Sequence, residues 1–311
     1  MSQQTHTTNS AVMCRPFHFG FNEQTHQDNA FQHKPEGTAL KVQSQAFDEF
    51  ESAAKQLSQA GINILILEHE PTLKVPDAVF PNNWFTTHAD GSVKLYPMKT
   101  ENRRQEVTPK RLKDLLLGAG YRVDQIDLIN DSVGCEGILE GTGALVFDHL
   151  ANKAYAAISE RCEESLFMEY CRHYNWSPFT FQAKGSTGQP IYHTNVMLSV
   201  GREFAVVCGA SIAESQRSQV LTQLQQNHSH VIDISLQQAE SMFCANILEL
   251  QNQQGDPIIT MSETAFNGFT SEQKNILSSC GDIVACKIPT IEHIGGGSMR
   301  CMLAENFLPK I

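Results

Sequence analysis

The clearest chemical signal in this 311-residue sequence is a glycine-rich run near its end, Gly295-Gly296-Gly297-Ser298-Met299-Arg300-Cys301-Met302. Glycine has no side chain to pack and loses much entropy when ordered, so the run predicts a loop whose backbone closely approaches another group. Cys301 is a candidate nucleophile, since a thiolate is the attacking form and a cation such as Arg300 favours it. A glycine-rich turn before a buried, unreactive cysteine fits this segment equally well.

Three further polar segments contain residues that could work with a nucleophile, at positions 77–84, 139–143 and 192–195. The second contains Glu140 and the third contains His193, each directly before an expected strand. A cysteine, a histidine and a glutamate are sufficient for nucleophilic catalysis with general acid–base transfer. Taken singly, Glu140 is equally a turn residue and His193 a hydrogen-bonded structural histidine. Their shared placement before strands favours the catalytic interpretation.

Secondary structure must position these segments, and the sequence from residue 143 onward repeats one pattern. Each repeat reads strand, strand, helix, strand, and successive repeats begin about 50 residues apart, a period typical of radial architectures. The expected elements are strands 143–148 and 154–158, helix 160–173 and strand 179–182; strands 196–200 and 204–208, helix 213–226 and strand 231–234; and strands 247–250 and 258–261, helix 271–280 and strand 283–286.

The first half is less regular, with strands expected at 62–67 and 92–96 and a helix at 46–60. We expect a single α/β domain over residues 1–311 with a propeller-like architecture. In such an architecture the strand ends converge on one axis, so the polar segments would line a central pocket.

Composition excludes several classes of function. A formal net charge of −11 argues against nucleic-acid binding. No apolar stretch reaches the roughly 18 residues of a membrane span, and the N-terminus has neither the basic nor the apolar region of a signal peptide. Nine scattered cysteines without a CxxC pair indicate reduced thiols, so we expect a cytoplasmic protein without a membrane partner.

No metal or organic cofactor is expected. The closest histidine pair, His228 and His230, has no HExxH motif or facing carboxylate beside it. A P-loop and a GxGxxG motif between strand and helix are both missing, which leaves nucleotide binding without support. The expected partner is a small molecule, and the sequence is also compatible with a homo-oligomer.

The sequence resembles the guanidine-modifying superfamily over nearly its whole length. This group includes arginine deiminase, dimethylarginine dimethylaminohydrolase, glycine amidinotransferase and succinylarginine dihydrolase. The run from Gly295 to Met302 is similar to the family loop that ends in the nucleophile, and Glu140-Gly141 is similar to its Glu-Gly-Gly-Asp signature. The resemblance implies a five-bladed, pseudo-symmetric ββαβ propeller (the pentein fold). It also implies Cys301 as nucleophile, His193 as general acid and base, and Glu140 as the residue that orients both histidine and substrate.

The same resemblance implies substrate-binding residues. Ser159-Glu160-Arg161-Cys162 is similar to the family segment whose arginine binds the substrate carboxylate, and an arginine-rich segment contributes Arg104. Asp77 lies six residues before Asn83, a spacing that the family uses to hold the substrate's α-amino group. Together these residues would recognise a zwitterionic amino acid. Surface salt bridges are the alternative for Asp77 and Arg104.

The departures from the family pattern indicate the substrate. Asn83, Asn195 and Gly143 stand where arginine-processing members have aspartates. A carboxylate only accepts hydrogen bonds and suits a cationic guanidinium, whereas an amide both donates and accepts. A neutral ureido group offers a C=O acceptor and an NH₂ donor, which two asparagines match. The segments Asp77–Trp84 and Tyr96–Met98 look like the citrulline hydrolase (citrulline ureidase) branch, to which the resemblance is closest.

We therefore expect hydrolysis of L-citrulline to ornithine, ammonia and carbon dioxide through a covalent cysteine intermediate. The nearest alternative keeps the site and changes the substrate: a guanidine hydrolase or amidinotransferase acting on arginine or methylated arginine. Two other classes stay open, a non-catalytic binding protein that retains the pocket and a cysteine peptidase or amidase.

Overall fold

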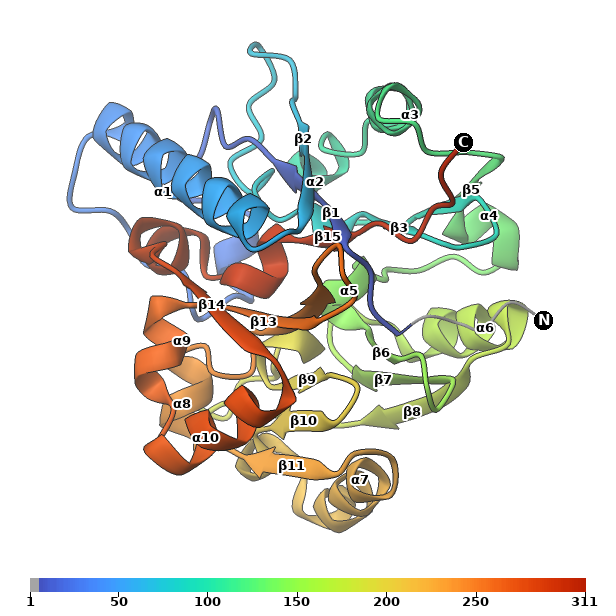
Figure 1. The fold of residues 1–311 in the computed structure, drawn as a ribbon, viewed down its shortest axis with the longest axis vertical. Helices are drawn as coiled ribbons and strands as arrows, with labels where there is room; N and C mark the ends of the chain where they lie inside the picture. The colour runs from blue at the N-terminus through green and yellow to red at the C-terminus, as the bar shows by residue number, and fades with distance from the viewer. Residues whose placement is uncertain (1–5) are drawn as a thin grey trace.

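The computed structural model describes residues 6–311, which form five three-stranded sheets around a common centre (Figure 1). In every sheet the middle strand pairs antiparallel with one neighbour and parallel with the other. The sheets, with the middle strand second, are β15 (Ala304–Glu305), β1 (Ser10–Cys14) and β2 (Asn63–Leu67); β3 (Phe85–Thr87), β4 (Ser92–Leu95) and β5 (Gln125–Leu128); β6 (Val146–Asp148), β7 (Lys153–Ala157) and β8 (Ser177–Phe181); β9 (Leu198–Val200), β10 (Phe204–Val207) and β11 (His230–Asp233); and β12 (Leu248–Gln251), β13 (Pro257–Ser262) and β14 (Asp282–Cys286).

A helix connects the two parallel strands of each sheet, because parallel neighbours require a crossover. These helices are α1 (Ala39–Gln59), α3 (Pro109–Gly118), α6 (Glu164–Tyr174), α7 (Glu214–Asn227) and α10 (Ser271–Cys280). They lie at the periphery of the molecule (Figure 1). In α1 the buried residues Val42, Ala46, Phe50, Ala53 and Leu57 recur every three or four positions, the spacing of one helix face packed on its sheet.

Short helices and turns complete the described chain. They are α2 (Glu101–Arg104), α4 (Ile129–Val133), α5 (Gly141–Ala144), α8 (Leu236–Glu240), α9 (Glu263–Gly268), η1 (Thr25–Gln27), η2 (Pro81–Asn83), η3 (Thr194–Val196), η4 (Gly209–Ser211), η5 (Ile291–Gly295) and η6 (Met299–Met302). Five of them, η2, α5, η3, η5 and η6, carry or flank the candidate site residues.

The repeat predicted from the sequence is confirmed in the last three sheets, and α10 matches the expected helix 271–280 residue for residue. Three strands begin later than expected: α5 occupies the start of 143–148, η3 lies across the start of 196–200, and β12 begins one residue after 247. The first sheet was not predicted as a unit. Its middle strand β1 pairs with β15 from the opposite end of the chain, in the register Ala11 to Glu305, which no local pattern reveals.

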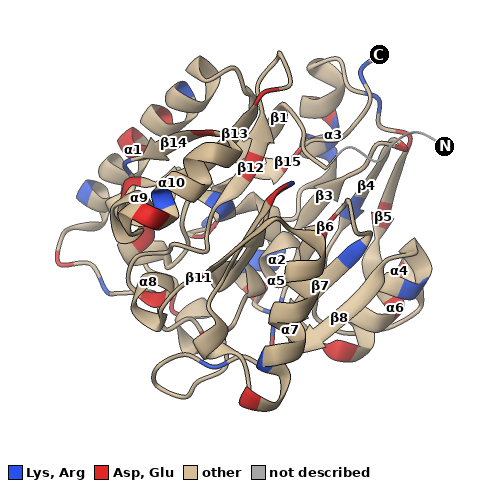
Figure 2. Cartoon of the chain, turned by 60° about the horizontal axis from the view of Figure 1, so that its bottom comes forward, with Lys and Arg blue, Asp and Glu red and all other residues tan. Residues whose placement is uncertain are grey.

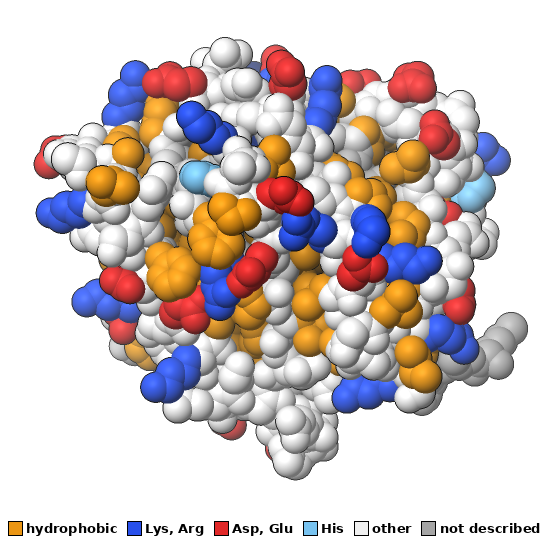
Figure 3. Space-filling view, turned by 90° about the horizontal axis from the view of Figure 1, so that it is seen from above, with side chains coloured by type: hydrophobic (Ala, Val, Ile, Leu, Met, Phe, Trp, Pro, Cys, Tyr) orange, Lys and Arg blue, Asp and Glu red, His pale blue; other side chains and the backbone are white. Residues whose placement is uncertain are grey.

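Charged side chains are distributed over helices and loops around the molecule (Figure 2). On the face seen in Figure 3, acidic and basic side chains are interspersed, so that face carries no patch of a single sign. Among residues 6–311, no helix is both long and apolar enough to cross a bilayer.

Candidate active site

Five turns, one before the first strand of each unit, carry the candidate residues. η2 precedes β3, α5 precedes β6, η3 precedes β9, the turn at Asn246 precedes β12, and η6 precedes β15. Every residue of η2, α5, η3 and η6 is buried. Because α5 contacts η2 and η3, and η2 contacts η6, segments far apart in sequence meet at one centre. The structure thereby brings Asn83, Glu140, His193, Asn195 and Cys301 together, as the sequence predicted.

Glu140 and His193 form a buried hydrogen-bonded pair. His193 Nε2 lies 2.8 Å from Glu140 Oε2, and Glu140 Oε1 accepts from the backbone N–H of Lys99 at 3.0 Å. Burial favours a higher pKa for Glu140, but Arg161 and His193 outweigh it and hold that pKa below its usual range. Burial lowers the pKa of His193 more than Glu140 raises it. The pair is thus a carboxylate and a neutral imidazole, with Nε2–H donating and Nδ1 left as the acceptor.

Cys301 lies on η6 with 3% of its surface exposed. Two amide groups point at its sulfur: Asn246 Nδ2 lies 3.2 Å from Sγ and Asn195 Nδ2 lies 3.5 Å from it. Burial raises the pKa of Cys301, and the hydrogen bonds and the charge of Arg300 lower it only in part. The expectation that Arg300 holds a resting thiolate therefore needs correction, because the effect of burial on the pKa outweighs that of Arg300 and Cys301 is a thiol.

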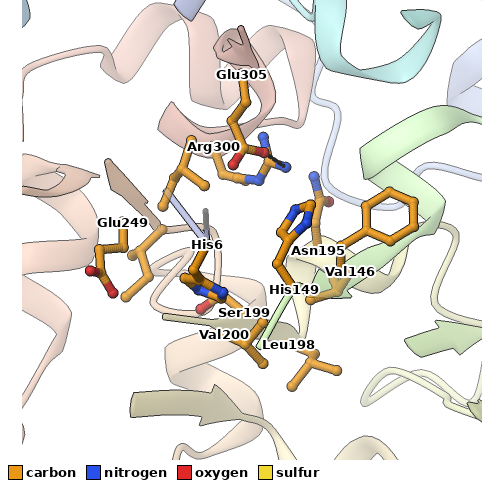
Figure 4. A pocket seen from close by; sticks show the side chains of 13 residues that line it. His6, Val146, His149, Asn195, Leu198, Ser199, Val200, Glu249, Arg300 and Glu305 are labelled. Atoms are coloured by element: carbon orange, nitrogen blue, oxygen red, sulfur yellow. Dashed lines mark hydrogen bonds and ion pairs between the residues drawn. The ribbon is translucent and has the colours of Figure 1, made fainter. Parts of the chain in front are cut away.

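The guanidinium of Arg300 is occupied elsewhere. It donates to the carbonyl of Leu303 at 2.8 Å and to Glu305 at 3.0 Å. Arg300 and Asn195 also line a cavity of about 30 Å³ along with His6, His149 and Ser199 (Figure 4). A volume of about 30 Å³ is the share of one water molecule in the liquid.

The glycine run does make the close approach that the sequence predicted, and its partner is the protein itself. A Cβ on Gly295 would lie 2.8 Å from the Phe80 ring, and one on Gly297 would lie 3.0 Å from it. Gly296 has φ +65°, and its Cβ would lie 2.7 Å from Gln32. The hydroxyl of Tyr192 donates to the Gly296 carbonyl at 2.6 Å. The glycines thus pack the nucleophile loop tightly against its neighbours.

Gly143, one of the three departures, has a local structural reason. A Cβ there would lie 2.3 Å from Asn83 Nδ2 and 2.7 Å from His193 Nδ1. An aspartate at this position requires the two site residues to move apart. The side chains at 83 and 193 therefore occupy the space that a carboxylate would fill.

Asp77 and Arg161 are buried, and polar groups of an N-terminal segment, residues 22–32, contact them. Asp77 accepts from Asn22 Nδ2 at 2.7 Å and from Thr25 Oγ1 at 2.9 Å. Arg161 binds the Asp28 carboxylate through Nε at 3.1 Å and donates to the Thr25 carbonyl at 3.0 Å. Segment 22–32 thus engages the two groups predicted to hold a substrate's amino and carboxylate ends.

The second arginine of the site is Arg103 in the structure. Arg103 is 2% exposed and donates to Asn83 Oδ1 at 2.9 Å and to Glu106 at 2.9 Å. Arg104 is exposed and donates to the backbone carbonyls of Met98 at 2.8 Å and Lys99 at 2.7 Å. The structure does not bring Arg104 to the other candidates, and its substrate role stays a prediction.

Sequence reasoning missed Arg103, Asn246 and the segment around Asp28. Adjacent arginines are equivalent by type, and only the helical phase of α2 decides which one points inward. Asn246 stands directly before a strand, as Asn195 does, and that equivalence between repeats is the one signal that could have found it. Asp28 belongs to an ordinary polar stretch with no such signal.

No cluster of three or more His, Cys, Asp or Glu side chains is placed to hold a metal ion among residues 6–311. His228 instead lies beside Asp148, with Nε2 3.3 Å from Oδ2. All nine cysteines are free thiols.

Comparison with known proteins gives one family match. A family model described as N,N dimethylarginine dimethylhydrolase, eukaryotic, matches residues 15–308 of the chain. No curated protein matches the chain in sequence.

Several solved structures have a similar fold. Apo ArgZ, an arginine dihydrolase from the ornithine-ammonia cycle in cyanobacteria, aligns with a TM-score of 0.72 at 15% identity, over 97% of this chain and 41% of that one. The chain thus spans about two fifths of that protein. The substrate-bound N-terminal domain of ArgZ aligns with a TM-score of 0.70 at 15% identity, over 96% of this chain and 99% of that domain. A dimethylarginine dimethylaminohydrolase adduct aligns with a TM-score of 0.63 at 13% identity, over 96% and 99%. At these identities the likeness shows the fold.

Proposed function

The chain belongs to the N,N dimethylarginine dimethylhydrolase family, and we propose that it is a cysteine hydrolase that cleaves the ureido group of L-citrulline. The single observation that carries the proposal is the buried arrangement of Cys301, His193 and Glu140. The amides of Asn195 and Asn246 lie beside the sulfur of Cys301. We also propose that the five units are blades of one propeller domain over residues 1–311.

In the proposed reaction, the Cys301 thiol transfers its proton to the neutral His193, and the sulfur attacks the ureido carbon. His193 then protonates the terminal nitrogen, which leaves as ammonia, and a thiocarbamate bond joins Cys301 to the rest of the substrate. Water, deprotonated by His193, attacks this thiocarbamate and releases the Cys301 thiol. The carbamate product decomposes to ornithine and carbon dioxide, so one water is consumed per citrulline. Glu140 stabilises the imidazolium at both stages.

Substrate recognition follows from the charges that the site lacks. Positions 83, 143 and 195 contribute no carboxylate, and the Glu140 carboxylate is already paired with His193 and Arg161. An unpaired buried carboxylate facing a neutral urea is costly, whereas an amide can donate to its C=O and accept from its NH₂. Arg161 and Arg103 would bind the substrate carboxylate, with Arg104 as the predicted addition, and Asp77 its ammonium.

Arginine or a methylated arginine is the second candidate substrate. The family description names dimethylarginine, and the neighbour ArgZ is described as an arginine dihydrolase. Hydrolysis of a guanidino C–N bond would use the same three catalytic groups. The citrulline and arginine proposals therefore differ only in the substrate.

The test is ammonia release by purified protein with L-citrulline, L-arginine and dimethylarginine side by side, with Cys301→Ala as the control. Turnover of citrulline that disappears in Cys301→Ala is the expected result. Faster turnover of arginine would overturn the substrate assignment and leave the nucleophile in place. No turnover of any of the three would favour a binding protein.

A further inference from the structure

Asn246 is a fully buried side chain that no sequence motif singles out. Its Nδ2 lies 3.2 Å from Cys301 Sγ and 3.1 Å from the backbone carbonyl of Asn195. Its Oδ1 has no hydrogen-bond partner among the residues that the structure describes. A buried amide group with half of its hydrogen-bonding capacity unused is unusual and calls for a functional explanation.

The backbone around Asn246 holds this amide in place. The N–H of Asn246 donates to the carbonyl of Phe243 at 2.8 Å, and Arg300 N donates to the carbonyl of Asn246 at 3.4 Å. Phe243 has φ +53°, a left-handed conformation that an aromatic residue adopts only when its surroundings impose it. Such strain concentrates at functional sites, and here it shapes the turn that presents Asn246 to the nucleophile.

The surroundings of the sulfur explain what this amide could do. Arg300, the residue next to the nucleophile, has its guanidinium bound to Leu303 and Glu305. The side chains that donate a hydrogen bond directly to Sγ are the neutral amides of Asn246 and Asn195, and a backbone hydrogen bond from Ser298 adds to them. An N–H donor aimed at an atom that becomes charged during a reaction stabilises that charge where it develops.

We propose that Asn246 is a further catalytic residue, which with Asn195 stabilises the Cys301 thiolate through neutral amide donors. This role rests on the proposed function only in that Cys301 is the nucleophile, and it holds for a ureido or a guanidino substrate. The two asparagines come from neighbouring units, Asn195 three residues before β9 and Asn246 two residues before β12. The two side chains that bind the sulfur are thus both uncharged.

The test measures the thiol itself and needs no substrate. Cys301 is alkylated with iodoacetamide across a pH series, and mass spectrometry follows the peptide that contains it, so the other cysteines do not interfere. Loss of one hydrogen bond to a charged group corresponds to a shift of about one pH unit or more. We expect the alkylation midpoint to rise by about that amount in Asn246→Ala, and further in Asn246→Asp, where a carboxylate faces the thiolate.

Asn227→Ala is the control, because Asn227 is half-buried and its Nδ2 lies 3.5 Å from the Tyr155 hydroxyl rather than beside Cys301. Its alkylation midpoint should equal that of the wild type. If Asn246→Ala fails to fold, the isosteric Asn246→Asp carries the test alone. An unchanged midpoint in a folded Asn246 variant would overturn the proposal. A raised midpoint in a protein that hydrolyses none of the three substrates would overturn the proposed function and leave the role of Asn246 standing.

Discussion

At the scale of residues, the site separates charge from the nucleophile. Glu140 and Arg161 form a buried ion pair to which the neutral His193 is hydrogen-bonded, whereas Cys301 receives hydrogen bonds from neutral amides. Burial without a directly bound cation keeps Cys301 as a thiol until a base removes its proton. The imidazole of His193 can accept that proton, because burial lowers its pKa and leaves the ring neutral at pH 7.

These two pKa shifts predict the pH dependence of the free enzyme. A lowered His193 pKa leaves the imidazole neutral at pH 7, so kcat/KM should hold on acidification until the pH falls below about 6.5, the ordinary histidine value. A raised Cys301 pKa places the midpoint of iodoacetamide alkylation above the ordinary thiol value. Alkylation that is already complete at pH 7 would contradict a resting thiol.

We expect His193 to need the Glu140 carboxylate in order to act as a general acid and base. In Glu140→Gln the imidazolium of His193 loses its negatively charged partner. Arg161 loses one of its buried carboxylate partners at the same time. General acid–base catalysis contributes about 10²–10⁴-fold, so kcat should fall by at least about 100-fold. KM should change much less than kcat in steady-state kinetics. A variant with near-normal kcat would remove Glu140 from the mechanism.

We also expect single residues to decide between the two candidate substrates. Asn83→Asp replaces an amide that can donate to a ureido C=O with a carboxylate that only accepts, which suits a guanidinium. We expect the ratio of kcat/KM for citrulline over arginine to fall by about tenfold or more, since mismatched hydrogen-bonding groups discriminate strongly. Asn227→Asp, outside the site, serves as the control. An unchanged ratio would show that position 83 does not select the substrate.

At the scale of elements, segment 22–32 occupies the predicted amino-acid end of the pocket. Asp28 binds Arg161 and Lys99, and Thr25 binds Asp77. A substrate carboxylate that binds Arg161 must therefore displace Asp28. A pocket of about 260 Å³, lined by Asp28, Glu160 and Tyr192 among others, lies beside this ion pair.

Removing the Asp28 charge should favour the substrate. In Asp28→Asn the Arg161 guanidinium has one competing carboxylate fewer, and we expect KM for an amino-acid substrate to fall several-fold, with each tenfold worth about 1.4 kcal/mol. Asp114→Asn breaks the exposed pair of Asp114 with Lys110 on α3 and is the matched control. If KM rises in Asp28→Asn but not in the control, Asp28 supports substrate binding instead.

At the scale of the whole molecule, the two ends of the chain complete one sheet. β15 pairs with β1, Asn306 N donates to the Ser10 carbonyl at 2.9 Å, and the nucleophile lies three residues before β15. Closure of the first unit and placement of Cys301 are thus one structural event. The centre of the molecule forms only when all five units are in place.

Truncation after Leu303 should therefore affect the entire protein. It removes β15 and the Glu305 carboxylate that binds Arg300. At this size each kcal/mol lost lowers Tm by roughly 2–4 °C, and we expect a drop of several degrees together with loss of activity. Differential scanning calorimetry measures the first and ammonia release the second. Full activity in the truncated protein would show that the active site forms without the pairing of β15 with β1.

The sequence by itself determined the last three repeating units and the segments that carry most of the candidate site residues. Periods of two and 3.6 residues repeat within each unit, and the glycine run marks a close approach whatever its partner is. Asn83, Glu140, His193, Asn195 and Cys301 could be found because each stands in a recognisable local motif before a strand or in the glycine loop.

Only the tertiary structure decided the rest. The pairing of β1 with β15, the inward phase of Arg103 rather than Arg104, and the ion pair of Asp28 with Arg161 are contacts between distant segments. The contact of Asn246 with Cys301 is of the same kind. The protonation of Cys301 also belongs here, because its pKa depends on burial, and burial is a property of the folded chain rather than of the neighbouring residues in sequence.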